Sequence, residues 1–517
     1  MKVLFANPAF RVPVDEVLER YFFLAGGRAP WSIIKNRSEP PRYSTFPFFL
    51  AYAAAVLEQR SFDVVAIDGV PLNLTDEEFE QRAVATAPDV IVLEPATVAI
   101  DRYLQVCARL KRLTGAKIVL AGPHVTHHGR ELMSGNPQID YVLVGEYEIV
   151  LADLLSGLRG NDPSTDLRCI HRDANGGVQG GSRAAEIDPL DQLPPPARHL
   201  FPAYFNNDQG LYHDGFCQGR PAVQLHASRG CPFRCDFCSW IQLMFDNGKH
   251  RCFSAPRIVD EMVDARDRFG AREIYFDDDN FTANKEHVHA ICREIRSRGL
   301  DLSWSVMGDA MITDGPMLEA MAEAGCVGMK FGLESASSDV LRAIRKPVDI
   351  QRIPGLVAKA QSLGMKTHAT VAFGLSGETR QSLNETFDFV CKLDVDSVQF
   401  SIATPYPGTR FHDSLVAEHR LSVSSWEDYD AGNSSVVRYA DFPREELQEF
   451  EATAWGRWLR YKLKQPKWVM RQAGLALRLL RGQGWSGLRR RLARGLHLLS
   501  EAELRNFKYR QRHPIRR

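Results

Sequence analysis

Short apolar runs alternate with longer amphipathic segments along the first 155 residues of the chain. The apolar runs have the length of buried strands, and the longer segments have the length and period of helices. Strands are expected at Val3–Ala6, Val64–Ile67, Val90–Leu93, Ile118–Ala121 and Tyr141–Val144. Helices are expected at Phe48–Gln59, Asp76–Thr86, Asp101–Leu113 and Tyr147–Leu158. Strands separated by helices predict an α/β domain with a doubly wound parallel sheet.

A second alternation of strands and helices begins at Val223. Its expected strands are Val223–Ala227, Glu273–Phe276, Ser303–Met307, Gly328–Leu333, Thr367–Phe373 and Val398–Ile402. Six such units predict a partial (β/α)6 barrel, whose site is built at the carboxyl ends of the strands. Between the two alternations, 167–185 reads as a hairpin and 187–196 as a stiff proline-rich linker.

The carboxyl-terminal region is predicted to be helical and is strongly basic. Residues 455–517 hold eighteen Lys and Arg against two acidic residues, although the whole chain has no net charge. Leucines recur on one helical face, at Leu488, Leu492, Leu496 and Leu499. This pattern is typical of a helix lying on an anionic membrane, and equally of a helix packed on the barrel with a solvated basic face. No nucleic acid is expected, because no RNA-binding module accompanies the tail.

The bulk composition is that of a globular protein, 44% hydrophobic and 25% charged. Ten cysteines without secretory features indicate a reducing compartment, where cysteines serve as ligands or core residues. No apolar run reaches the roughly 18 residues that a membrane-spanning helix needs. The expected localisation is therefore cytoplasmic, with peripheral contact at the inner face of the membrane if the basic tail binds lipid.

Three cysteines stand together at Cys231, Cys235 and Cys238, directly after the first predicted barrel strand. Thiolates are the soft ligands that iron–sulfur clusters take. Three of them leave the fourth iron of a cubane without a protein ligand, so that a substrate or cofactor can bind there. The alternative is a zinc site of three cysteines completed by His250.

This C-x3-C-x2-C run, with the aromatic Phe237 before its third cysteine, resembles the signature of the radical S-adenosylmethionine (SAM) superfamily. The resemblance implies a [4Fe–4S] cluster on the three cysteines and SAM chelated by the open iron. Other strand-end motifs resemble the family's SAM contacts: F-x-D-D-x-F-T, G-L-E-S and a G-L-x-G-E-T run in which Ser376 replaces the usual proline. The SAM-binding residues that they imply are Asp278, Asp279, Glu334, Ser335, Gly374 and Gly377.

The runs 120–126 and 141–146 resemble the cobalamin-binding, Rossmann-like domain of B12-dependent radical SAM enzymes. The resemblance implies that cobalamin lies against the strand-end loops, at Asn7, Pro8, Glu94, Gly122, Pro123, His124, Gly145 and Glu146. The D-x-H-x-x-G motif, which supplies a cobalt ligand in many cobalamin proteins, is missing, because the first strand runs directly into Asn7-Pro8. We therefore expect cobalamin without a histidine lower ligand, and we interpret His124, His127 and His128 as solvated loop residues.

The predicted domains are a cobalamin-binding domain at 1–158, a hairpin and connector at 159–215, a radical SAM partial barrel at 216–415 and a helical basic region at 416–517. The whole resembles the methylase and anaerobic magnesium-protoporphyrin ester cyclase-like branch. That resemblance implies an enzyme that cleaves SAM to a 5′-deoxyadenosyl radical, with a one-electron reductant such as flavodoxin or ferredoxin. The expected reaction methylates an unactivated carbon of a small or lipophilic biosynthetic intermediate.

Three other functions are alternatives to this reading. A B12-dependent cyclase or oxidative rearrangement without methyl transfer needs the same site and stays open. A non-catalytic cobalamin-binding protein would not need the SAM-facing motifs. An RNA methylthiotransferase would need a second cysteine triad in the first domain, where Cys107 stands alone.

Overall fold

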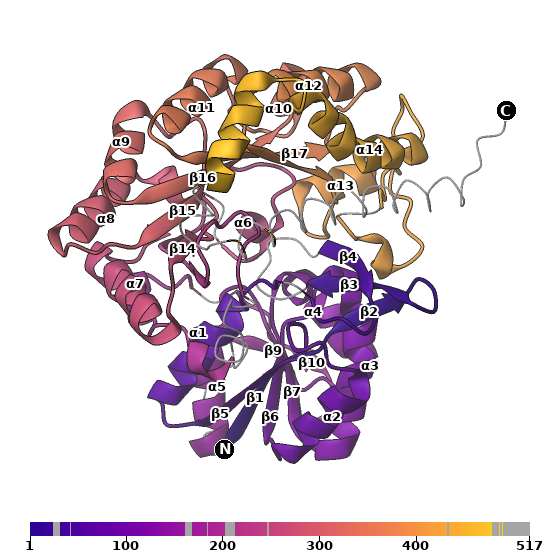
Figure 1. The fold of residues 1–517 in the computed structure, drawn as a ribbon. Coiled ribbons are helices and arrows are strands. Elements are labelled where there is room, and N and C mark those ends of the chain that lie inside the picture. Colours follow the sequence, from indigo (N-terminus) through magenta and orange to yellow (C-terminus); the bar gives the residue numbers. More distant parts are fainter. Residues whose placement is uncertain are drawn as a thin grey trace.

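The computed structural model describes residues 1–23, 31–41, 43–160, 168–183, 185–201, 212–245, 248–431 and 434–477, together with 485 and 489. The chain forms two halves, each built on a parallel sheet (Figure 1). The first half holds the amino-terminal sheet and its helices. The second holds the six-stranded sheet, over which the carboxyl-terminal helices pack.

The first sheet has the strand order β10-β9-β8-β7-β6-β1-β5. Strand β1 lies between β5 and β6, parallel to both, and successive residues of β1 enter different cores, Val3 and Phe5 in one and Leu4 and Ala6 in the other. The sheet is therefore covered on both faces, as doubly wound folds require. Its elements are β1 (Lys2–Asn7), α1 (Phe48–Gln59), β5 (Asp63–Asp68), α2 (Asp76–Ala85), β6 (Val90–Leu93), η1 (Thr97–Ala99), α3 (Ile100–Thr114), β7 (Lys117–Leu120), α4 (Pro123–Gly135), β8 (Tyr141–Leu143), α5 (Glu148–Gly160), β9 (Cys169–Arg172) and β10 (Val178–Gln179).

The predicted hairpin is present as β9 and β10, and it extends the first sheet because β9 pairs antiparallel with β8. The predicted domain limit at residue 158 thus falls between two strands that pair with each other. The four domain limits remain a prediction. Helix α1 begins and ends at the predicted residues, whereas α4 was not predicted.

A separate three-stranded antiparallel sheet follows β1 and was also not predicted. It consists of β2 (Phe10–Pro13), β3 (Leu18–Phe23) and β4 (Trp31–Asn36). Its buried Glu19 pairs with Lys35, whose Nζ lies 2.7 Å from Glu19 Oε1. Buried charge inside short strands hides the apolar alternation by which such strands are recognised.

The second sheet is parallel throughout, in the order β11-β14-β15-β16-β17-β18. Side chains on one side of its strands pack in the hydrophobic core with the surrounding helices. Ile274, Val306 and Val371 are examples. Its elements are β11 (Ala222–Leu225), β12 (Ser228–Arg229), α6 (Ser239–Leu243), β13 (Arg251–Cys252), α7 (Ala255–Phe269), β14 (Glu273–Phe276), α8 (Lys285–Ser297), β15 (Ser303–Gly308), α9 (Gly315–Glu323), β16 (Cys326–Glu334), α10 (Ser338–Ala343), α11 (Ile353–Ser362), β17 (Lys366–Phe373), α12 (Arg380–Lys392), β18 (Ser397–Ile402) and α13 (Arg410–Ala417). This is the predicted six-unit barrel.

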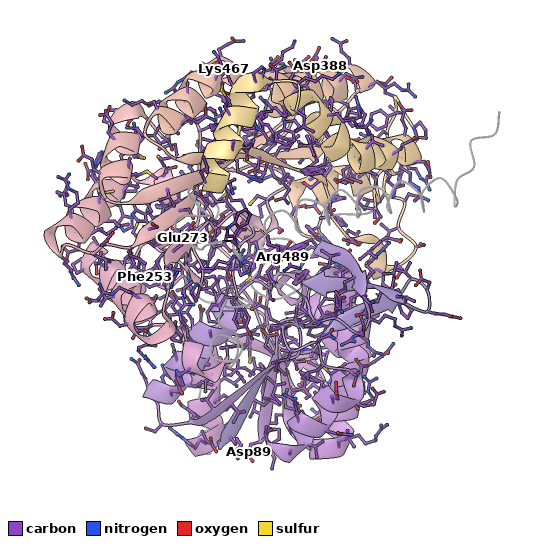
Figure 2. The ribbon with its side chains drawn as sticks, in the orientation of Figure 1. Asp89, Phe253, Glu273, Asp388, Lys467 and Arg489 are labelled. Atoms are coloured by element: carbon purple, nitrogen blue, oxygen red, sulfur yellow. The ribbon has the colours of Figure 1, made fainter. Side chains whose placement is uncertain are left out.

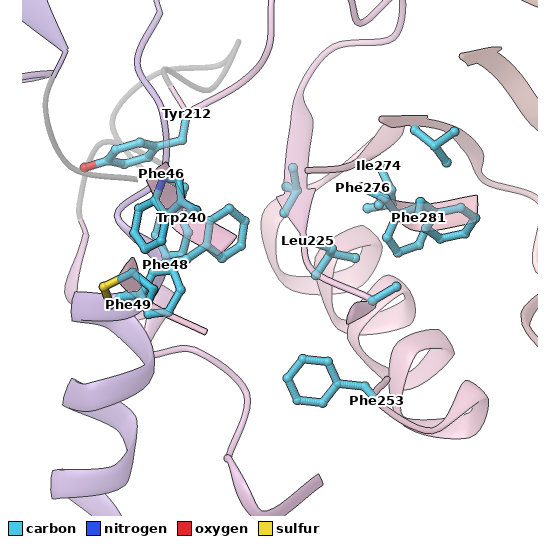
Figure 3. Close-up of a cluster of buried hydrophobic side chains, with 14 of the residues drawn as sticks. Phe46, Phe48, Phe49, Tyr212, Leu225, Trp240, Phe253, Ile274, Phe276 and Phe281 are labelled. Carbon is cyan, nitrogen blue, oxygen red and sulfur yellow. The ribbon is translucent and has the colours of Figure 1, made fainter. Parts of the chain in front are cut away.

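One hydrophobic core runs across both halves. Side chains of α1 reach the barrel: Phe49 stacks on Trp240 with ring centroids 4.9 Å apart, and Phe48 stacks on His226 at 3.7 Å. Figure 3 shows Phe46, Phe48 and Phe49 grouped with Trp240, beside the barrel residues Leu225, Ile274 and Phe276. Shared burial of this kind holds the two halves together.

Figure 2 shows side chains filling the region where the halves meet, with Asp89 at the far end of the first half. Asp89 precedes β6, so the amino edge of the first sheet points away from the barrel. The carboxyl ends of the same strands, where the predicted cobalamin contacts lie, point toward it (Figure 1).

The described part of the basic tail packs on the barrel. It contains the second half of α14 (Arg444–Lys462) and helical residues 466–477. Trp468 is buried and donates from Nε1 to Val395 O at 3.0 Å, and Arg471 binds Asp394 and Asp396 at 2.7 and 2.6 Å. Within the basic region 455–517, the packed-helix alternative therefore holds for residues 455–477. The leucine stripe and most of its arginines lie outside the described residues.

Among the described helices, none combines the length and the apolar character needed to cross a membrane.

Candidate active site

The three cysteines lie in the loop that joins the first barrel strand to α6. Burial raises the pKa of all three thiols, that of Cys235 to about 12, and the neighbouring cysteines add to the effect at Cys235 and Cys238. Buried thiols favour the thiolate form only beside a strong positive charge, which iron supplies. The donor set therefore fits a cubane cluster.

The zinc alternative finds no support in the contacts of His250. Its Nδ1 faces Cys252 Sγ at 3.7 Å rather than one of the three cysteines. Within the described ranges, no three His, Cys, Asp or Glu side chains converge as ligands of a single metal ion. A cubane needs no such convergence, since each thiolate binds a different iron.

The cysteine loop is held by side chains from elsewhere in the barrel. Gln242 Nε2 donates to the carbonyl oxygens of Cys235, Asp236 and Cys238 at 3.3, 2.9 and 3.0 Å. Asn280 Nδ2 lies 3.6 Å from Cys231 Sγ. Amide donors at a ligand sulfur tune a cluster and orient its ligand. Phe237 packs on an apolar cluster that includes Val340 and Leu341, which accounts for the aromatic in the motif.

Asp278 and Asp279 both brace the start of the cysteine loop. Asp278 is buried and accepts from Ala227 N at 2.9 Å and from the Ser228 hydroxyl. Asp279 Oδ2 accepts from Gly230 N at 2.9 Å. These contacts give both carboxylates a structural role beside the cysteines. Their predicted contact with the SAM ammonium stays a prediction.

Glu334 ends β16 in a left-handed conformation, with φ of 60°, beside an irregularity in the β16–β17 pairing. Its Oε1 lies 2.8 Å from Lys346 Nζ. Burial alone lowers the pKa of Lys346, but Glu334 and Cys235 more than offset it, so the pKa is raised and the lysine is charged. Lys346 was not predicted, because no motif surrounds it. Ser335 is buried and its hydroxyl lies 3.0 Å from Thr386 Oγ1.

Gly374 and Gly377 both have positive φ, 82° and 78°. A Cβ at Gly374 would lie 2.3 Å from Tyr439 Oη and 2.6 Å from a methyl of Leu447. Packing against the carboxyl-terminal region therefore explains this glycine without a ligand. The approach of both glycines to adenine remains a prediction.

At the cobalamin edge, two predicted residues are engaged in buried polar contacts. Asn7 Nδ2 donates to Asp68 at 2.8 Å, and Asn7 Oδ1 accepts from Tyr103 Oη at 3.0 Å. Glu94 accepts from Tyr147 Oη at 2.6 Å, and burial raises its pKa to about 7. Pro8 is buried beside Asn7. The predicted contacts of these three residues with cobalamin remain a prediction.

His124 is a correction to the sequence analysis, because it is 2% exposed rather than solvated. It occupies the first turn of α4, after Gly122 and Pro123, with Nδ1 3.2 Å from Thr97 Oγ1. Its ring meets that of Trp426, with centroids 5.1 Å apart. Burial lowers its pKa to about 3, so the imidazole is neutral.

The last two predicted cobalamin residues are Gly145 and Glu146. Gly145 has a φ of 78°, and its N–H donates to Thr126 Oγ1 at 3.0 Å. The Glu146 carboxylate binds Arg229 and Arg251 of the barrel half at 2.8 and 2.7 Å. Glu146 thus joins the two halves, and its predicted contact with cobalamin rests on its position alone. Sequence reasoning missed both arginines, since they belong to no motif.

Comparisons with known proteins agree with this architecture. The family model for the radical SAM superfamily matches residues 225–390, and the B12 binding domain matches residues 41–155. An uncharacterized methyltransferase of Pyrococcus horikoshii is 31% identical over 404 residues, 78% of this chain and 85% of that protein. The cytidylyl-2-hydroxyethylphosphonate methyltransferase of Streptomyces wedmorensis is 27% identical, over 72% of this chain and 78% of that enzyme.

Among solved structures, the cobalamin-dependent SAM radical enzyme OxsB with aqua-cobalamin bound has a TM-score of 0.64 at 14% identity, covering 98% of this chain and 80% of that one. That likeness shows the shared fold. The extended identity with the Pyrococcus protein, the two matched domains and the three cysteines inside the second of them lead to one assignment. The chain belongs to the B12-dependent radical SAM family, whose cofactors are a [4Fe–4S] cluster, SAM and cobalamin.

Proposed function

We propose that this cobalamin radical SAM enzyme is a C-methyltransferase, which replaces a hydrogen on an unactivated carbon of a small molecule with a methyl group from SAM. The observation that carries the proposal is that both relatives described above are named methyltransferases. One of them matches 78% of this chain. When bound, the three cofactors supply the radical and the methyl group, with electrons from an external one-electron reductant.

The protein's own contribution is to hold and enclose these groups. Cys231, Cys235 and Cys238 lie on a loop that side chains of the barrel hold in place. The two halves meet at an interface rich in aromatic residues, where Phe48 stacks on His226 and Phe49 on Trp240. Exclusion of water by such an interface protects a reactive radical from side reactions.

The experiment is a reaction of reduced, reconstituted enzyme with SAM that carries a trideuterated methyl group, followed by mass spectrometry of a metabolite pool. The proposal predicts a deuterated methyl group on carbon in one metabolite, together with 5′-deoxyadenosine. Formation of 5′-deoxyadenosine with a product that lacks the label would instead indicate cyclisation or oxidative rearrangement, and the methyltransferase proposal would be wrong.

A further inference from the structure

Four buried charged residues cross the interface between the two halves: Glu146, Glu148, Arg229 and Arg251, here called the interface charge cluster. The glutamates lie beyond the end of β8, and the arginines face each other across the β12–β13 pair. Arg229 bridges both glutamates, at 2.8 Å to Glu146 and 2.6 Å to Glu148, and Arg251 binds Glu146 at 2.7 Å. None of the four is more than 4% exposed.

Buried ion pairs are an inefficient way to gain stability. Removing four charges from water is costly, and well-packed apolar residues of similar volume commonly do as well. A bridging arginine instead fixes relative placement, because its planar guanidinium holds two carboxylates in one geometry. The Arg229 guanidinium also lies over the rings of Phe49 and Tyr52 on α1, 4.7 and 5.0 Å from their centroids.

Arg229 stands two residues before the first cluster cysteine. On the barrel side, Asp278 and Asp279 hold the backbone at Ala227 and Gly230. On the other side, Glu146 and Glu148 hold Arg229 from the end of β8, next to Gly145. The short stretch 227–231 is thus fixed from the barrel and from the cobalamin-binding domain at once.

We propose that Arg229 is a positioning residue, which through Glu146 and Glu148 sets the placement of the cluster-binding loop relative to the cobalamin-binding edge of the first sheet. Placement matters in this family because a displacement of about 1 Å at a reacting centre is enough to slow a reaction substantially. The role is independent of which substrate the enzyme takes and of whether a methyl group is transferred.

The first test changes the cobalamin-binding domain and measures the cluster loop. Glu148→Gln preserves the shape of the side chain but removes one of the two charges that Arg229 binds. In the full-length protein without cofactors, amide hydrogen exchange of peptides covering 227–238 should become about tenfold faster. The matched control is Glu19→Gln, an equally buried acid paired with Lys35 in the β2–β4 sheet, which should leave these peptides unchanged.

The second test uses the reconstituted protein. In Arg229→Lys the charge remains, but a single ammonium cannot hold both carboxylates in the fork of a guanidinium. Iron and cobalt contents should match those of the wild type. The distribution of distances between the reduced cluster and cob(II)alamin should broaden, as measured through their dipolar interaction by pulsed electron paramagnetic resonance. Glu19→Gln should show the wild-type interaction.

Unchanged exchange in folded Glu148→Gln would overturn the proposal, as would an unchanged dipolar interaction in Arg229→Lys. If Glu148→Gln does not fold, Arg229→Lys, which keeps the buried charge, decides alone. A fall in melting temperature without either change would make the interface charge cluster a purely structural feature, and the positioning role would be rejected.

Discussion

Glu94 shows how burial controls an ionisable side chain at the cobalamin edge. Burial raises its pKa to about 7, although its contact with Tyr147 acts in the opposite direction. At pH values between the ordinary carboxyl pKa and about 7, Glu94 therefore keeps a proton in the folded state that it has released in the unfolded state. Folding stability must fall as pH rises through this window, and the loss persists at higher pH.

Glu94→Gln removes this titration. Relative to wild type, the variant should gain up to about 3 kcal/mol of stability as the pH rises from about 4 to about 8. Urea unfolding at a series of pH values measures the difference. Asp68 and Glu378, whose pKa values burial also raises to about 7, contribute equally to both proteins. Parallel stability curves for the two proteins would contradict the assignment.

His124 leads to a spectroscopic prediction. Its Nδ1 lies 3.2 Å from Thr97 Oγ1, its ring is packed beside Trp426, and the residue lies in the first turn of α4. We expect cobalamin to bind without an imidazole ligand. Electron paramagnetic resonance of the cob(II)alamin form should then lack nitrogen splitting from an axial imidazole. A clear imidazole pattern that disappears in His124→Ala would show that this histidine binds cobalt.

At the residue scale, the sequence shows the cysteines as a motif but does not show the contacts around them. Cys231, Cys235 and Cys238 form a local motif, so they can be found without a structure. The partners of Glu146 and Asp278 come from distant positions in the chain, and Lys346, the partner of Glu334, lies twelve residues beyond it, so motif spacing carries no information about them. Lys346 and Arg229 were missed for the same physical reason.

Among the elements, strands and helices with a strong apolar pattern were predicted closely. Strands β6 and β14 and helix α1 have the expected limits. The prediction failed for β2–β4, where charged residues interrupt short strands. It also failed for α4, which begins Pro123-His124 and carries three histidines in its first turns.

The helical residues 466–477 lead to a prediction at this scale. Trp468 is buried against the barrel, whereas its neighbour Val469 is 40% exposed. Trp468→Ala should destabilise the protein by about 3 to 5 kcal/mol, because it removes a large buried side chain and leaves a cavity. Val469→Ala is the matched control and should change the melting temperature little. Equal melting temperatures for both variants would contradict the packing of this segment.

At the scale of the whole molecule, two parallel sheets are joined through one hydrophobic core and one set of buried charges. The residues after β8 reach the start of the cysteine loop, where Glu146 and Glu148 bind Arg229. The residues predicted to hold cobalamin and those predicted to hold the cluster thus lie in different halves of the molecule.

The central claim is that a single chain combines a cluster on three cysteines with cobalamin on a separate domain. Metal analysis of anaerobically reconstituted protein tests it most directly. We predict about four irons and about one cobalt per chain in the wild type. The Cys231→Ala/Cys235→Ala/Cys238→Ala variant should lose almost all iron and keep its cobalt. Equal iron in both proteins, or no cobalt in either, would contradict the account.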